Sequence, residues 1–365
     1  MDKTSQWLNL QYKPALPRDL SRGIGIIGAG EIVAEAHLPA YQMAGFRVVA
    51  ITNRTRSRAQ EVADRYGIPH VYDTIDELLA DPDVQIVDIA LTAELQPEIV
   101  AKVAAHGKHI LCQKPLGDSY TAARRIVDIC DRASIKVAVN QQMRWAPGIR
   151  ASHDLIRRGF LGTSVQAAIQ VNVRTPWETW PWLTTIDTLE VMYHSIHYLD
   201  AIRFLFGSPE SVYADGARYP GQPYKGETRT MIHMKFAGEM RALIHDNHNN
   251  WADQRDWYAT YRFEGTSGII KGTNGALYNY PVGEEDTIRF ISRDAQDHGW
   301  LEPPLQGKWF PHAFMGTMGE LMRAIEENRE PENSARDNLQ TIQLVFAVYR
   351  SMAEHRPVRL TEITS

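Results

Sequence analysis

A lysine at the end of an apolar run occupies a position where a side chain could act as a general acid or base. Residues 108–117 read Lys-His-Ile-Leu-Cys-Gln-Lys-Pro-Leu-Gly, so Lys114 follows a short apolar strand and precedes Pro115. The proline restricts the lysine to extended backbone and so fixes the direction of its side chain. A lysine whose surroundings lower its pKa can act as a general base. From position alone, the commoner alternative is a surface lysine in a strand-end turn.

A second group of titratable side chains occurs at helical spacing further along the chain. Tyr193, His197 and Asp200 share one predicted helix face at i, i+4 and i+7. His194 lies one turn from His197, and Glu190 opens the same stretch. Several titratable groups on a largely apolar helix need partners or a polar cavity. A lone histidine in such a place is more often a core residue with satisfied hydrogen bonds.

Three further histidines could line the same cleft or serve a structural role, namely His245, His248 and His312. The histidines and cysteines of the chain do not show the tight spacing that is typical of metal ligands. We therefore expect no metal site.

A glycine-rich segment near the start of the chain has the pattern of a dinucleotide site. Residues 28–33 read Gly-Ala-Gly-Glu-Ile-Val, and they follow an apolar strand and open a helix. Glycines in this context let the backbone approach a pyrophosphate that rests on the amino end of the helix. Val33 stands at the third glycine position, so helix and strand pack less closely there. The alternative is an ordinary tight turn. The placement favours cofactor contacts at Gly28, Gly30, Glu31 and Ile32.

The end of the second predicted strand indicates which dinucleotide is preferred. Residues 52–58 read Thr-Asn-Arg-Thr-Arg-Ser-Arg and contain no acidic residue. An NAD site usually has an Asp or Glu there for the ribose 2′-hydroxyl, whereas a 2′-phosphate is bound by arginine and small hydroxyls. We therefore expect NADP to be preferred and NAD to be possible, with Asn53, Arg54 and Arg58 at the cofactor. A solvated basic helix start is the alternative.

The elements that position these residues alternate regularly over residues 22–142. Apolar, β-branched runs predict strands, and amphipathic segments between them predict helices over 58–66, 97–105 and 121–132. Such alternation is typical of a doubly wound parallel sheet, the Rossmann type of α/β domain. The predicted strands are 24–27, 48–52, 84–91, 109–112 and 136–139.

Residues 143–365 have a different pattern, which predicts an α+β domain with a large, open, mainly antiparallel sheet. A helix (149–158), a strand (165–173), a loop with three tryptophans and a long helix (187–206) come first. Many strands follow over 211–290, including a hairpin of 229–235 with 240–246. Two helices, 313–327 and 335–354, end the chain. Residues 1–21 form a polar arm before the first domain.

Composition limits the classes of partner. The 365 residues carry a formal net charge of −5, with both signs spread along the chain, which argues against nucleic acid and membrane partners. The start lacks a hydrophobic signal core. Cys112 and Cys130 imply no disulfide framework, so a reducing cytoplasm fits best. One face of a large sheet needs covering, and self-association is a common solution.

Together these motifs resemble the Gfo/Idh/MocA family of glucose-fructose oxidoreductase and myo-inositol dehydrogenase. The resemblance runs from Arg22 through the glycine segment, residues 108–115, and the stretch Ser-Ile-His-Tyr-Leu-Asp at 195–200, to the closing helix. It implies an NAD(P)-dependent oxidoreductase that acts on a sugar, inositol or related polyol, with a Rossmann domain and an open-sheet domain used for homodimers or homotetramers. It also implies that Lys114 is the catalytic lysine and His197 the catalytic histidine.

The chain departs from the family pattern at three places. Gln113 replaces a glutamate beside the lysine, and Tyr193 replaces an aspartate four residues before the histidine. Residues 91–93 read Leu-Thr-Ala instead of Thr-Pro-Asn, so cofactor contacts there must differ. We expect Thr92 and Gln113 at the cofactor. Tyr193 then assists the proton transfer or is only a packing residue.

The resulting interpretation is a cytoplasmic, oligomeric dehydrogenase or reductase in which Lys114 and His197 handle the hydroxyl proton. Two alternatives stay open: a regulatory protein that binds NAD(P) and a sugar without turnover, and an enzyme that cleaves glycosides through a transient ketone with bound cofactor. For the substrate side we expect contacts from Arg144, Trp177, His194 and His312. The tryptophan loop could equally be an oligomer contact or a lid on the core.

Overall fold

The computed structural model describes residues 5–278 and 282–364, which form two compact units. One unit, here called the six-stranded unit, comprises Pro14–Gln142 and Phe310–Ile342. The other, the eight-stranded unit, comprises residues up to Lys13, Met143–Trp309 and Gln343–Thr364. Each holds one sheet. In the described part of the chain, no helix is long and apolar enough to cross a membrane.

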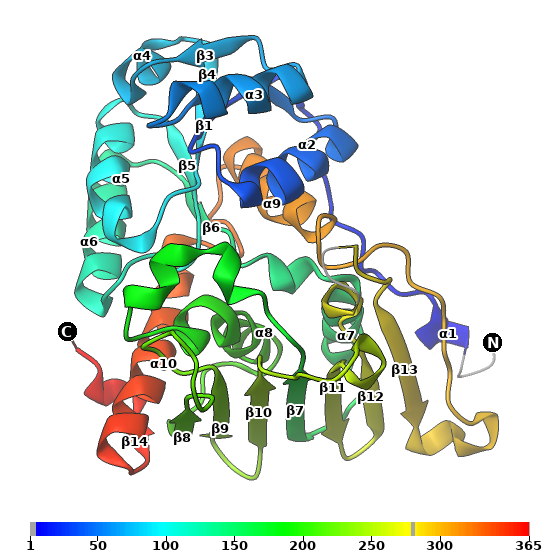
Figure 1. Ribbon diagram of the computed structural model, residues 1–365. Coiled ribbons are helices and arrows are strands. Elements are labelled where there is room, and N and C mark those ends of the chain that lie inside the picture. The colour runs from blue at the N-terminus through cyan, green and yellow to red at the C-terminus, as the bar shows by residue number, and fades with distance from the viewer. Residues whose placement is uncertain (1–4, 279–281, 365) are drawn as a thin grey trace. The chain divides into compact units, whose positions relative to one another are not determined.

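The six-stranded unit is a doubly wound parallel sheet with the strand order β3-β2-β1-β4-β5-β6. Its strands are β1 (Gly23–Ile27), β2 (Arg47–Thr52), β3 (His70–Tyr72), β4 (Val84–Ile89), β5 (His109–Cys112) and β6 (Val137–Val139). Its helices are α2 (Leu38–Ala44), α3 (Arg56–Tyr66), α4 (Ile75–Ala80), α5 (Gln96–Ala105), α6 (Tyr120–Ala133) and α9 (Ala313–Glu326). Helices α5 and α6 pack together, as do α2 and α9, and the two pairs flank the strands (Figure 1). The predicted Rossmann architecture is confirmed.

Apolar side chains on both faces of this sheet explain its parallel form. All five residues of β1 are buried, and β4 is buried except at Gln85. Strands buried on both faces are characteristic of sheets covered by helices on two sides. Strand β3 and helix α4 were not predicted from the sequence. Both are short, and α4 is marked mainly by a capping box of Thr74 and Glu77.

The segment 310–342 corrects the predicted domain boundary, which placed it with the second domain. Helix α9 buries Phe314, Met318, Leu321 and Met322 in the same core as Ile24 and Ile51 of the parallel sheet. Burying four large apolar side chains stabilises this packing by several kcal/mol, at about 1.5 to 3 kcal/mol each. The N-terminal arm likewise divides, because residues up to Lys13 belong to the eight-stranded unit and Pro14 onward to the six-stranded unit.

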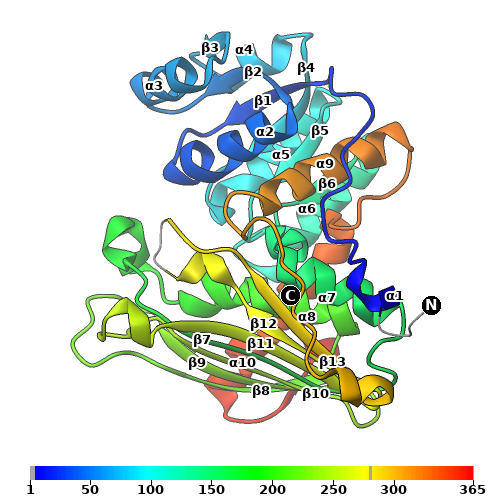
Figure 2. The same ribbon diagram turned by 90° about the vertical axis from the view of Figure 1, so that its right-hand side faces the viewer.

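The eight-stranded unit contains a mixed, mainly antiparallel sheet with the order β13-β12-β11-β7-β10-β9-β8-β14. The strands are β7 (Ser164–Asn172), β8 (Ser211–Ala217), β9 (Arg229–Lys235), β10 (Arg241–Asn247), β11 (Tyr258–Gly265), β12 (Gly268–Thr273), β13 (Thr287–Ser292) and β14 (Val358–Arg359). The helices are α1 (Ser5–Leu8), α7 (Pro147–Arg157), α8 (Ile196–Phe206) and the later part of α10 (Ala335–Glu354). Figure 2 shows α7 and α8 on one face of the sheet, and both contact its strands. The predicted fold class is confirmed.

Two local predictions in this unit have different outcomes. The hairpin is confirmed: β9 and β10 pair antiparallel, and Gly238 in the turn has φ +68°. The prediction of one long helix over 187–206 is wrong in its first turns, because a π-helical turn, Val191–Ser195, precedes α8. The buried carboxylate of Glu227 accepts the backbone N–H groups of Leu189 and Val191, so a side chain satisfies the donors of the first turn.

Candidate active site

The glycine segment forms an open turn between β1 and the following helix. Gly28 has φ +113°, and a Cβ atom there would lie 2.5 Å from the carbonyl oxygen of Ala90, so only glycine fits. A Cβ on Gly30 would meet no described atom within 4 Å. The backbone N–H of Ala29 donates to the Asn53 side chain at 3.1 Å, and this bond ties the turn to the end of β2. The turn therefore leaves space beside Gly30 for a phosphate group.

The other predicted cofactor residues lie around the same edge of the six-stranded unit, after strands β1, β2, β4 and β5. Glu31, Arg54 and Arg58 are exposed, whereas Ile32 and Thr92 are partly buried. This edge holds the carboxyl ends of the strands, where doubly wound sheets bind their ligands.

Gln113 and Lys114 are held by a clamp that sequence reasoning missed. The amide of Gln96, which is fully buried, donates to the carbonyl oxygens of Gln113 and Pro115 at 2.8 and 2.7 Å. The side chain of Gln113 accepts the backbone N–H of Lys114 at 2.8 Å. Burial lowers the pKa of Lys114 to about 7. A base or acid of this kind works best when its pKa lies near neutral pH.

A buried polar network lies behind this edge and was also missed. His37, at the end of the π-helical turn Val33–His37, approaches the Asp88 carboxylate with its Nδ1 at 2.7 Å. The Tyr41 hydroxyl donates to the same carboxylate oxygen at 2.7 Å. The amides of Gln113 and Asn140 lie 3.2 and 3.1 Å from His37 Nε2. A π-helical turn is uncommon and often marks a functional site. Here it places His37 against Gln113, the neighbour of the predicted catalytic lysine.

In the eight-stranded unit, the predicted catalytic histidine is buried against a tryptophan. His197 is 3% exposed, and its ring meets Trp309 edge-on with centroids 4.9 Å apart. His194 lies 6.5 Å from His197 and 6.4 Å from Trp309, between ring centroids. The structure thus brings His194, His197 and Trp309 together, although sequence reasoning did not select Trp309.

Tyr193 packs elsewhere, which corrects the predicted shared face. Its ring meets Trp182 edge-on at 5.2 Å and packs on the cluster of Trp177, Leu183, Leu189 and Tyr224. The reason is the π-helical turn, which shifts the helical spacing so that positions 193 and 197 no longer follow one α-helical stripe. These contacts favour packing over proton transfer for Tyr193.

The other residues that were predicted to contact substrate lie in different surroundings. Arg144 makes a buried bidentate ion pair with Asp200, in which its Nε and a terminal nitrogen each lie 2.7 Å from a carboxylate oxygen; its contact with substrate stays a prediction. Trp177 is 4% exposed and forms part of the tryptophan-loop core. His312 belongs to the six-stranded unit. Its substrate role stays a prediction.

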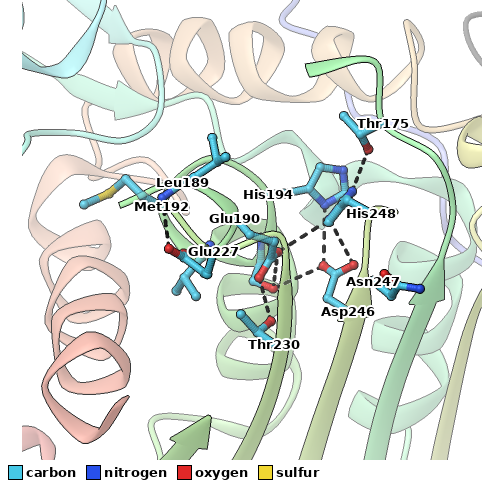
Figure 3. A network of polar contacts seen from close by, with 12 residues as sticks. Thr175, Leu189, Glu190, Met192, His194, Glu227, Thr230, Asp246, Asn247 and His248 are labelled. Atoms are coloured by element: carbon cyan, nitrogen blue, oxygen red, sulfur yellow. Dashed lines mark hydrogen bonds and ion pairs between the residues drawn. The ribbon is translucent and has the colours of Figure 1, made fainter. Parts of the chain in front are cut away.

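A group of acidic and histidine side chains lies beside His194 (Figure 3). His248 Nε2 is 2.9 Å from Asp246 Oδ1 and 3.6 Å from Glu190 Oε1. Burial by itself lowers the pKa of His248, but the Asp246 and Glu190 carboxylates outweigh it and raise that pKa to about 9. Burial, with repulsion from Asp246, raises the pKa of Glu190.

Asp246 was missed, although the sequence contains a signal for it. On β10 the buried positions alternate, so Ala242, Ile244 and Asp246 share one face, and His248 follows two residues later. An acidic residue and a histidine that continue an apolar period-two pattern into the interior require polar partners.

Comparisons with known proteins match both parts of the chain. Residues 22–141 match the family described as "Oxidoreductase family, NAD-binding Rossmann fold", and residues 149–277 match the "GFO/IDH/MocA C-terminal domain". D-apiose dehydrogenase of Paraburkholderia graminis is 25% identical over 93% of this chain and 89% of its own length. 1,5-Anhydro-D-fructose reductase of Ensifer adhaerens is 25% identical over 90% of this chain and 96% of its own.

The fold also matches a solved structure over nearly its full length. An oxidoreductase from Agrobacterium radiobacter, in complex with NAD+, L-tartaric acid and magnesium, superposes with a TM-score of 0.82. The match covers 94% of this chain and all of that chain at 22% identity.

Proposed function

The chain belongs to the Gfo/Idh/MocA oxidoreductase family, which has an NAD-binding Rossmann fold, and from this we propose that it transfers a hydride between a nicotinamide cofactor and a hydroxyl-bearing carbon of a sugar, inositol or related polyol. The observation that carries the proposal is Lys114, with a pKa lowered to about 7, at the same sheet edge as the open glycine turn. The dehydrogenase and reductase activities in the names of the two relatives support this substrate class.

The nucleotide site fits a dinucleotide on physical grounds. The space beside Gly30, the positive φ of Gly28 and the following helix provide a cradle for a pyrophosphate. Glu31, Ile32, Asn53, Thr92 and Gln113 are the residues proposed to complete the site. When bound, the nicotinamide accepts the hydride in oxidation and returns it in reduction.

Proton transfer is assigned to Lys114 and His197. In oxidation, neutral Lys114 Nζ takes the hydroxyl proton while the carbon loses its hydride; in reduction, the ammonium returns that proton to the new alkoxide. His197, on the eight-stranded unit, orients the hydroxyl or shares its proton. Neither role depends on Tyr193.

A sugar panel tests the proposed function. The protein is incubated with NADP+ or NAD+ and aldoses, inositols, anhydrosugars and lactones, and the absorbance of reduced cofactor is followed. Steady formation of reduced cofactor with at least one member supports the proposal. Binding of cofactor and sugar without turnover indicates a regulatory protein, and glycoside cleavage with unchanged cofactor indicates transient redox chemistry.

We propose NADP(H) as the preferred cofactor because Arg54 and Arg58 are exposed beyond β2. Replacing Arg54 with alanine should weaken NADP(H) binding about 10- to 100-fold relative to NAD(H), because a charge-assisted contact contributes about 1.5 to 3 kcal/mol. Fluorescence titration of both cofactors measures this. Arg56→Ala is the control, since Arg56 pairs with Asp73. Tighter NAD(H) binding by the unaltered protein would contradict the preference.

The pH dependence should differ in sign between the two directions. Because the pKa of Lys114 is lowered to about 7, the neutral base needed for oxidation is the majority form above pH 7. Below that, it decreases about tenfold per pH unit. We expect kcat/KM for oxidation to rise with pH through about 7 and kcat/KM for reduction to fall through the same range. Rates that are flat between pH 6 and 8 in both directions would argue against Lys114.

We further propose that the protein acts in the cytoplasm as a homodimer or homotetramer. Both cysteines are free and buried, which suits a reducing compartment. The sheet face opposite α7 and α8 exposes Tyr213, Met231 and Leu243 at 44%, 60% and 38%. Apolar residues gathered on three neighbouring strands are typical of an interface.

A charge on that face should disrupt the assembly. Met231→Glu should shift the protein toward monomer in light scattering coupled to size exclusion, because a carboxylate would be desolvated on association. His233→Glu, on the same strand, tests whether a carboxylate elsewhere on this face also shifts the protein toward monomer. An unaltered protein that is monomeric at micromolar concentration would refute the proposed assembly.

A further inference from the structure

Four side chains with metal-binding atoms converge inside the eight-stranded unit. Glu190, His194, Asp246 and His248 each offer one ligand atom, and these atoms all lie within 4.8 Å of one another. In a tetrahedral Zn²⁺ site with bonds of about 2.0 to 2.2 Å, the ligand atoms lie about 3.3 to 3.6 Å from one another. Side-chain rotations that bring the most widely spaced of these atoms about 1.2 to 1.5 Å closer would therefore let all four contact a single ion.

Nitrogen and oxygen atoms lie close together at the centre of the group. Asp246 Oδ1 and His248 Nε2 are only 2.9 Å apart. Within the described part of the chain, however, both are buried atoms without a hydrogen bond of acceptable geometry. His194 Nδ1 is 3.7 Å from Asp246 Oδ2. Nitrogen and oxygen atoms therefore face one another around a common point, as they would around a cation.

Hydroxyl groups outside the group hold the ligand side chains in place (Figure 3). The Thr175 hydroxyl lies 2.6 Å from His248 Nδ1, which directs the other ring nitrogen, Nε2, toward the carboxylates. The Thr230 hydroxyl donates to Glu190 Oε2 at 2.6 Å. Metal-binding histidines and carboxylates usually have such hydrogen-bond partners, which fix the tautomer and orientation.

Charge and burial favour a cation here. The side chains of Glu190, Asp246 and His248 are fully buried, and a protonated His248 supplies one positive charge against two carboxylates, whose burial is costly unless positive charge compensates both. A divalent ion would neutralise both carboxylates. The side chain of His194 is 15% exposed, so it provides the edge at which an ion could enter.

We propose that Glu190, His194, Asp246 and His248 bind one divalent transition-metal ion, with Zn²⁺ as the best match to two imidazoles and two carboxylates. This proposal departs from the expectation from sequence that no metal site exists. Two of its ligands come from the turns that precede α8 and two from the end of β10. Because these segments are far apart in the sequence, ligand spacing along the chain does not reveal the set. The ion would join these two segments and so stabilise the eight-stranded unit.

Zinc binding can be measured without cofactor or sugar, so its failure would not affect the proposed oxidoreductase activity. The purified chain is stripped with a chelator, titrated with ZnCl₂ by calorimetry, and separately loaded with Co²⁺ for visible spectroscopy. We expect one Zn²⁺ per chain, a higher melting temperature with Zn²⁺, and Co²⁺ absorption bands from nitrogen and oxygen ligands.

Variants identify the ligands. Asp246→Asn and His248→Gln should each weaken Zn²⁺ binding about 100-fold or more, since the loss of an outer hydrogen-bond partner alone costs 10- to 100-fold. His194→Gln, at the exposed edge, provides a ligand variant that should fold normally. The matched controls are Asp215→Asn on β8 and His245→Gln on β10, which should bind Zn²⁺ as the unaltered chain does.

Two results would overturn the proposal. One is an unaltered chain that binds no Zn²⁺ more tightly than about 10 μM. The other is a folded His194→Gln chain whose Zn²⁺ affinity and Co²⁺ spectrum equal those of the unaltered chain.

Discussion

Replacing Lys114 with alanine should lower kcat about 10²- to 10⁴-fold on the best substrate of the sugar panel, because a positioned acid or base typically contributes that much. The cofactor dissociation constant should change little, since the proposed role of Nζ is toward the substrate hydroxyl. Steady-state kinetics and cofactor titration on the same preparation separate the two effects. The pH-dependent rise in oxidation through about 7, which is the pKa of Lys114, should vanish with the side chain.

Lys102→Ala is the matched control for this variant. Lys102 lies on α5 of the same unit and forms an exposed ion pair with Asp76, so its loss should leave kcat unchanged. Removing Lys114 should not unfold the chain, because the clamp made by Gln96 acts on backbone atoms. A Lys114→Ala protein with near-normal kcat would remove the lysine from the mechanism.

Replacing His197 with glutamine should also lower kcat by about 10²- to 10⁴-fold. Glutamine keeps a polar group of similar length and limits the cavity beside Trp309, which packs against the histidine ring. The melting temperature should therefore fall by only a few degrees. Turnover, measured alongside thermal unfolding, distinguishes a catalytic loss from a folding defect.

His233→Gln is the control for His197, since His233 lies exposed on β9. A His197→Gln protein that folds normally and retains near-normal turnover would remove His197 from the mechanism. If turnover and melting temperature fall together in both His197→Gln and His233→Gln, the lost turnover would instead reflect a less stable fold.

The sequence predicts the parallel sheet well because its strands carry a strong local signal. Strands β1, β2, β4, β5 and β6 are each within two residues of the predicted bounds at either end. Buried β-branched runs bounded by glycine or polar turns leave little choice of structure. Strand β3 (His70–Tyr72) and helix α4 are too short for periodicity to be visible.

The division of the chain into units could not be predicted in the same way. Helix α9 is predicted almost to the residue, but not which core it joins. The apolar stripe of Phe314, Met318, Leu321 and Met322 indicates that this helix face is buried, but it does not indicate which of the two cores the face joins. That choice depends on tertiary packing.

The residues of the candidate site could likewise be predicted only where a local motif marks them. Lys114, Gly28 and Gly30 follow local motifs, so the sequence indicates them directly. The clamp of Gln96 and the pair of Asp246 with His248 depend on contacts between distant segments. The separation of Tyr193 from His197 depends on a single π-helical turn, which the apolar periodicity does not reveal.

The central claim is hydride transfer, and following deuterium from substrate to cofactor tests it most directly. The best sugar of the panel is labelled with deuterium at the carbon that is oxidised and incubated with NADP+, and the cofactor is examined by mass spectrometry. We predict that the reduced cofactor carries one deuterium and that the sugar becomes the corresponding ketone or lactone. Reduced cofactor without deuterium, or converted sugar beside unchanged, unlabelled cofactor, would contradict the account.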